Sequence, residues 1–170
     1  MSQTALVFDS PIPSSAWTAH PILEFLANYQ QVYNSDFIAI RSERFYSKHC
    51  LMHLPDASQI TGNEDMWDFF NLVYGGYGKV TRNLLSLILV PDGNIERTGK
   101  VYIQVHTRLF YDASDDPKSI LVPQSFVYTV GKADKGVGTD DLQFVELRCY
   151  YDMSLVKKAA SLRDARHGQS

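Results

Sequence analysis

Two histidines are the strongest candidates for proton transfer in this sequence, because an unperturbed imidazole titrates close to physiological pH. His53 lies in a short strand-like run, residues 50–54, that stops at Pro55. His106 lies in a longer alternating run, on the opposite side from Val105. Strict alternation places His106 on the outer face of a sheet, and a β-bulge is needed to turn it inward. His53 likewise needs a one-residue shift of its strand to reach an interior pocket.

Tyrosines form a second set of candidates, since three of them occupy helical faces that should turn inward: Tyr29, Tyr33 and Tyr74. A phenol in such a place can donate a hydrogen bond to a substrate carbonyl or enolate. It can equally be a core residue with a satisfied hydroxyl. Trp67 is expected to wall the same cavity. Polar residues on strands, whose facing the pattern leaves open, complete the candidates for substrate binding: Asn83, Gln124, Ser125 and Tyr128.

The composition is that of a single globular domain. The chain has 170 residues, 45% of them hydrophobic and 21% charged, with a net charge of −3. This charge offers no basic surface for nucleic acid. No apolar run reaches the ~18 residues of a membrane span and no secretory signal is visible, so we expect a cytoplasmic protein without membrane contact. Cys50 and Cys149 are expected to be reduced, and no metal-ligand spacing surrounds either one.

The elements that must position these residues begin with helices. Apolar spacing predicts a helix from Pro21 to about Asn34, a second from Phe37 to about residue 48, and a third from about residue 63 to Tyr74. The domain is expected to span 1–170, with its core over 19–152. Residues 1–18 should form an irregular arm and residues 153–170 a helix or a frayed tail.

The second half of the chain predicts strands at 84–90, 95–111, 119–131 and 142–152. In the last of these, Val145, Leu147, Cys149 and Tyr151 alternate with polar residues, as in a strand with one buried side. Helices segregated from an antiparallel sheet define an α+β fold. We therefore expect three N-terminal helices packed in a strongly curved antiparallel sheet that encloses an apolar space.

In this order the elements resemble the nuclear-transport-factor-2-like superfamily, which includes ketosteroid isomerases, SnoaL-like polyketide cyclases and scytalone dehydratases. The resemblance covers about residues 19–152. It rests on the helix link Tyr33-Asn34-Ser35-Asp36-Phe37, the element Met52-His53-Leu54-Pro55, the helix after Gly62, and the final strand at 145–152. It implies a conical pocket between the sheet and the helices, and a homodimer through the outer face of the sheet.

The carboxylates of these enzymes are missing from the matching positions. The catalytic Asp of the isomerases corresponds to Leu54, and the second pocket carboxylate to Gln124 or Ser125. The Asp and the strand-opening His of scytalone dehydratase correspond to Asn34 and Asn83. Proton transfer by the usual groups of the superfamily is therefore not expected.

Other positions do match. Tyr29 lies where the isomerases place an oxyanion-stabilising tyrosine, and His53 matches a histidine of many SnoaL-like sequences. Tyr151 is expected near the pocket. We therefore expect catalytic roles for His53, His106 and Tyr29, with no cofactor and no metal.

The expected function is isomerisation, cyclisation or dehydration of an apolar polycyclic intermediate of polyketide or terpenoid secondary metabolism. The alternative is a non-catalytic module for ligand binding or dimerisation. The two differ in the cavity they require, since ligand pockets usually measure about 300–1,000 Å³. A cavity of that size favours the enzyme, and a shallow or filled cone favours the binding module.

Overall fold

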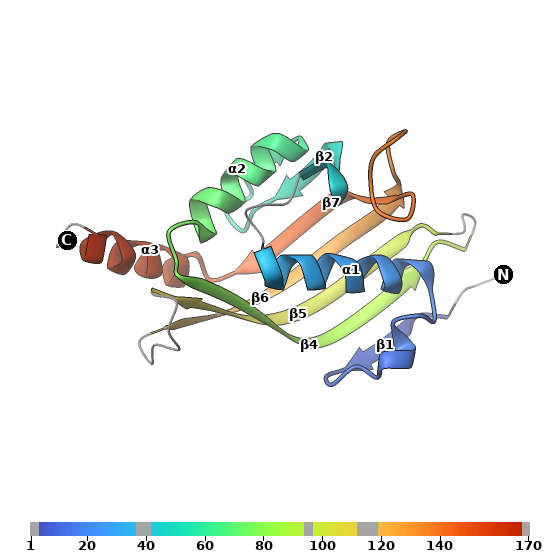
Figure 1. Cartoon of the computed structure of the whole chain (residues 1–170), viewed down its shortest axis with the longest axis horizontal. Coiled ribbons are helices and arrows are strands. Elements are labelled where there is room, and N and C mark those ends of the chain that lie inside the picture. The colour runs from blue at the N-terminus through green and yellow to red at the C-terminus, as the bar shows by residue number, and fades with distance from the viewer. Residues whose placement is uncertain (1–3, 37–41, 94–96, 112–118, 168–170) are drawn as a thin grey trace.

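The computed structural model describes residues 4–36, 42–93, 97–111 and 119–167 (Figure 1). Its α-helices are α1 (Pro21–Asp36), α2 (Asn63–Tyr74) and α3 (Met153–His167), and short 3-10 helices cover Ser14–Ala16 and Ser42–Arg44. The strands are β1 (Leu6–Asp9), β2 (Tyr46–His53), β3 (Gln59–Thr61), β4 (Lys79–Pro91), β5 (Gly99–Phe110), β6 (Ile120–Lys132) and β7 (Leu142–Tyr151).

The described strands form one open, mixed sheet in the order β1-β4-β5-β6-β7-β2-β3. All neighbours are antiparallel except β2 and β7, which run parallel. Helix α1 lies along one face of this sheet, with α2 beside it over β2, and α3 extends the chain past β7 (Figure 1). We call the face covered by α1 the inner face, and the opposite one the outer face. The α+β class is therefore confirmed.

Helix α1 forms where its apolar spacing predicts it. Ile22, Phe25 and Leu26 are buried on one side, and the same stripe continues to Tyr29 and Tyr33. The ring of His20 begins the helix, because its Nδ1 accepts a hydrogen bond from the Ile22 amide at 3.2 Å. Burial lowers the pKa of His20, which keeps this nitrogen available as an acceptor.

The second predicted helix is wrong over its C-terminal part. Residues 37–41 lie outside the described part of the chain, but Ser42–Arg44 is a 3-10 turn and β2 begins at Tyr46. The backbone of β2 is paired with β7, and its alternating Cys50 and Met52 are fully buried. Strand pairing with burial on one side therefore overrides the helical pattern of residues 45–48. The third α-helix of the described chain is the C-terminal one, and the sheet is mixed rather than purely antiparallel.

The N-terminal arm is more regular than expected, since β1 pairs with β4 at an edge of the sheet. The last strand also differs in one position. Leu147 and Cys149 are buried as predicted, but the pairing with β6 shifts between Thr129 and Val130. Val145 is the extra residue of this bulge, so Phe144 takes its place on the inner face.

A second bulge, in β4, decides which side chains face the interior. The pairing with β5 shifts between Leu84 and Ser86, so Leu85 is the extra residue. Arg82 and Leu84 face inward before the bulge, and Leu87 and Leu89 face inward after it. Because of the bulge, Arg82 before it and the leucines after it all lie on the inner face, although they are an odd number of residues apart.

Candidate functional site: an aromatic cavity around Arg82

A small, partly open cavity of about 30 Å³ lies between the inner face and α1. This is space for about two water molecules. Its walls come from one helix and three neighbouring strands: Leu26, Tyr29, Gln30, Tyr33, Arg82, Leu84, Ile103, Val105 and Tyr128. The lining is apolar and aromatic apart from Gln30, Arg82 and the phenol hydroxyls. Aromatic side chains thus fill most of the space that the fold would otherwise leave open.

Among the described residues of this lining, Arg82 alone carries a cationic group. Its Cζ atom lies 3.8 Å from the ring centroid of Tyr33, 5.1 Å from that of Phe126 and 5.2 Å from that of Tyr74. The Nε and Nη2 atoms of Arg82 are buried and have no hydrogen-bond partner within the described chain. No carboxylate among the described residues forms an ion pair with it. A guanidinium stays protonated at any physiological pH, so the cavity contains a full positive charge.

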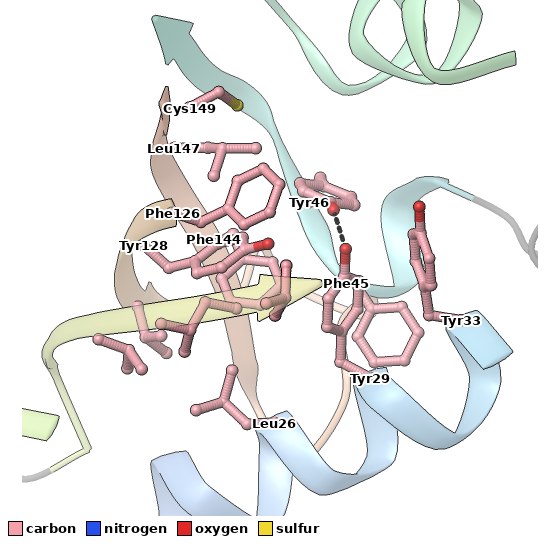
Figure 2. Close-up of a cluster of buried hydrophobic side chains, with 14 of the residues drawn as sticks. Leu26, Tyr29, Tyr33, Phe45, Tyr46, Phe126, Tyr128, Phe144, Leu147 and Cys149 are labelled. Atoms are coloured by element: carbon pink, nitrogen blue, oxygen red, sulfur yellow. Dashed lines mark hydrogen bonds between the residues drawn. The ribbon is translucent and has the colours of Figure 1, made fainter. Parts of the chain in front are cut away.

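A cluster of buried phenols stands beside this charge. The hydroxyls of Tyr29 and Tyr46 are 2.7 Å apart and hydrogen-bonded, as Figure 2 shows. Tyr33, one turn further along α1, stands apart from that pair (Figure 2). Burial raises the pKa of Tyr29, although Arg82 and the hydrogen bond with Tyr46 act in the other direction. Burial likewise raises the pKa of Tyr33, Tyr46 and Tyr128 well above the ordinary value. These phenols are therefore neutral hydrogen-bonding groups and not phenolates.

Two hydrogen bonds between buried side chains hold the hydroxyl of Tyr74, which flanks Arg82. Thr107, directly opposite Arg82 in the sheet, donates to the Oε1 atom of Gln124, and the Nε2 atom of Gln124 donates to the Tyr74 hydroxyl at 3.2 Å. Thr107 and Gln124 are both buried. The side chain of Gln124 is thus turned inward, but it is used to hold Tyr74 rather than to line the cavity.

The two histidines lie on the outer face. His53 contacts the Glu146 carboxylate, with 3.2 Å between Nε2 and Oε1, and Glu146 also binds Arg148. His106 pairs with Asn83 across β4 and β5, in a shallow outer depression that also includes Ser125 and Tyr150. Neither the strand shift nor the bulge that would turn them inward is present at their positions. His53 and His106 therefore do not reach the aromatic cavity.

The other predicted residues divide in the same way. Tyr29, Tyr33 and Tyr128 line the cavity, while Tyr74 contacts it through Arg82. Trp67 packs on Tyr46 and Phe70 at the side of the cluster, and Tyr151 is half-buried next to Gln124. Asn83 and Ser125 belong to the outer face. The side chain of Asn34 lies outside the described part of the structure.

The polar groups of the cavity are hydrogen-bond donors and a cation, without a basic group among the described residues. The cavity offers phenol hydroxyls and a guanidinium, but no carboxylate or imidazole of the described chain lines it. The described residues also contain no group of three or more His, Cys, Asp and Glu side chains placed to hold a metal ion. None of the helices over the same residues has the length and apolarity needed to cross a membrane. Such a cavity can bind and polarise an electron-rich group, but it has no strong base of its own.

Comparisons with known proteins agree on the fold alone. No family model and no curated protein matches the sequence. Among solved structures, nuclear transport factor 2 from Cryptosporidium parvum aligns with a TM-score of 0.55 and 16% identity, over 76% of this chain and 90% of that one. A protein from Novosphingobium aromaticivorans, provisionally assigned as a scytalone dehydratase, aligns with a TM-score of 0.58 and 13% identity, over 78% and 82%.

A third structure, provisionally assigned as a SnoaL-like polyketide cyclase from Jannaschia sp. CCS1, aligns with a TM-score of 0.53 and 13% identity, over 80% of this chain and 90% of that one. The chain therefore has the nuclear-transport-factor-2-like fold, as its sequence predicts. Identities this low carry no function from one protein to another.

Proposed function

We propose that this protein binds a compact, largely apolar small molecule in the cavity between α1 and strands β4, β5 and β6. The observation that carries the proposal is the aromatic lining around a polar group whose hydrogen bonds are incomplete. Small-molecule sites typically combine such an apolar wall with a few fixed polar groups. The volume of about 30 Å³ favours a small ligand, or the compact head of a larger one, over a polycyclic molecule.

Enzymatic isomerisation, cyclisation or dehydration of a polyketide or terpenoid intermediate is the second candidate. It is favoured by the hydrogen-bonded pair of Tyr29 and Tyr46 near Arg82, since neutral phenols and a cation can stabilise an oxyanion. The absence of a base from the described lining favours binding over proton abstraction. Because the described lining offers no base, a proton removed from the substrate in such a reaction would have to be accepted by another group of the substrate itself.

We also propose a homodimer through the outer face. Several large apolar side chains are exposed along this face. Single exposed apolar residues are common on protein surfaces, but a group of them on one face is typical of an interface. The exposed apolar side chains of this face are Ile88, Val90, Tyr102, Leu121 and Tyr150.

The binding proposal is tested with a variant in which a larger side chain fills the cavity. In Val105→Phe the added ring projects from the cavity wall, whereas Val127→Phe adds the same ring on the outer face of the neighbouring strand. Amide chemical shifts are followed during titration with four probes of three or four heavy atoms each: acetamide, acetate, formamide and formate. We expect at least one probe to perturb residues of α1, β4 and β5 in the wild type and in Val127→Phe, but not in Val105→Phe. Absence of such shifts for all four probes would contradict the proposal.

A further inference from the structure

We propose that the ligand of this cavity carries a carboxylate, and that Arg82 binds it through its Nε and Nη2 atoms. The inference rests on the proposed binding function and specifies the chemical class of the ligand.

The two unsatisfied atoms of Arg82 lie on the same edge of the guanidinium. Their N–H bonds run nearly parallel, and this edge matches the two oxygens of a carboxylate in a bidentate pair. Both atoms are buried and lack a partner within the described chain. The two free N–H groups of Arg82 therefore favour a ligand group that is both negatively charged and shaped like a carboxylate.

The surroundings hold the guanidinium without neutralising it. Tyr33 stacks on it, and Phe126 and Tyr74 flank it, which stabilises the cation through the faces of their rings. Contacts with ring faces leave the N–H bonds in the guanidinium plane free to donate. A buried charge without a counter-ion is unfavourable, and proteins rarely keep one unless it serves a site.

The remaining walls define the rest of the ligand. Leu84, Ile103 and Val105 present apolar surface next to Arg82, and Leu26 closes the side formed by α1. A carboxylate attached to a short apolar group satisfies both parts of this lining. A neutral molecule of the same shape would leave the N–H edge of Arg82 unpaired.

The experiment compares carboxylates with their amides, which have nearly the same shape and no charge. Dissociation constants are measured by calorimetry for acetate and acetamide, and for the smaller pair formate and formamide, in a buffer free of other carboxylates. For at least one pair we expect the wild type to bind the carboxylate at least tenfold more tightly. Arg82→Met should abolish this preference. Arg82→Lys, which keeps the charge but not the two parallel donors, should reduce it severalfold.

The control variant is Arg108→Met, because Arg108 is exposed on the adjacent strand and bonds to Ser119. It should keep the wild-type preference. Equal affinity of carboxylate and amide, or a preference that persists in Arg82→Met, would overturn the inference and leave the binding proposal intact. Failure of all four probes to bind would overturn both.

Discussion

Replacing Arg82 with methionine should make the free protein more stable. Methionine fills a similar volume, removes the buried charge and leaves no unsatisfied N–H group. Substituting apolar side chains for buried charged groups is often neutral or stabilising, by about 1–4 kcal/mol. The lost ring contacts, above all with Tyr33, offset part of this, at about 0.5–2 kcal/mol. We expect the free energy of unfolding, measured by urea denaturation without added anions, to rise by about 1–2 kcal/mol.

Arg108→Met is the matched control for this measurement too. Its side chain is exposed on the outer face, so its substitution should change stability by no more than about 0.5 kcal/mol. A loss of more than about 1 kcal/mol in Arg82→Met would mean that the guanidinium is satisfied in the free protein. Stability gained by removing a residue is the behaviour expected of a group retained for function.

Replacing Phe144 with alanine should have the largest effect in the opposite direction. Phe144 is fully buried at the centre of the aromatic cluster of Figure 2. Its ring centroid lies 4.5 Å from that of Tyr128, 4.9 Å from that of Phe25 and 5.0 Å from that of Tyr29. Truncating such a ring leaves a cavity that its neighbours close only in part, and typically costs about 3–5 kcal/mol.

Leu72→Ala is the control at an exposed apolar position of α2. Leu72 is 73% exposed, so the loss of its side chain should cost less than about 1 kcal/mol in the same urea experiment. If Phe144→Ala cost no more than Leu72→Ala, the ring would not be packed as described, and the walls formed by Tyr29 and Tyr128 would lack the support assigned to them.

The sequence predicts the scaffold of this site better than its chemistry. The stripe from Ile22 to Tyr33 and the helix ending at Tyr74 have strong periodicity, so both helices lie where the sequence places them. Tyr29 and Tyr33 line the cavity because they belong to that stripe, whereas the pattern leaves the facing of Tyr128, on β6, open. Residues 45–48 show the limit, because the pairing of β2 with β7 joins segments almost a hundred residues apart. No local pattern contains that information.

Arg82 lies outside the strand that the sequence predicts, because that strand begins at residue 84, whereas β4 begins at Lys79. Extended to its true start, the strand alternates Val80, Arg82 and Leu84 on one face. A charge within an apolar alternating set is the signal that could have identified it. The histidines were selected instead for their intrinsic pKa, a property of the residue type that says nothing about which face of the sheet they occupy.

The most direct test of the central claim is a crystal structure of the protein with acetate. Our account predicts the methyl group of acetate between α1 and β5, with the two carboxylate oxygens about 2.7–2.9 Å from Nε and Nη2 of Arg82. A ligand bound only on the outer face near His106, or one whose carboxylate points away from Arg82, would contradict it.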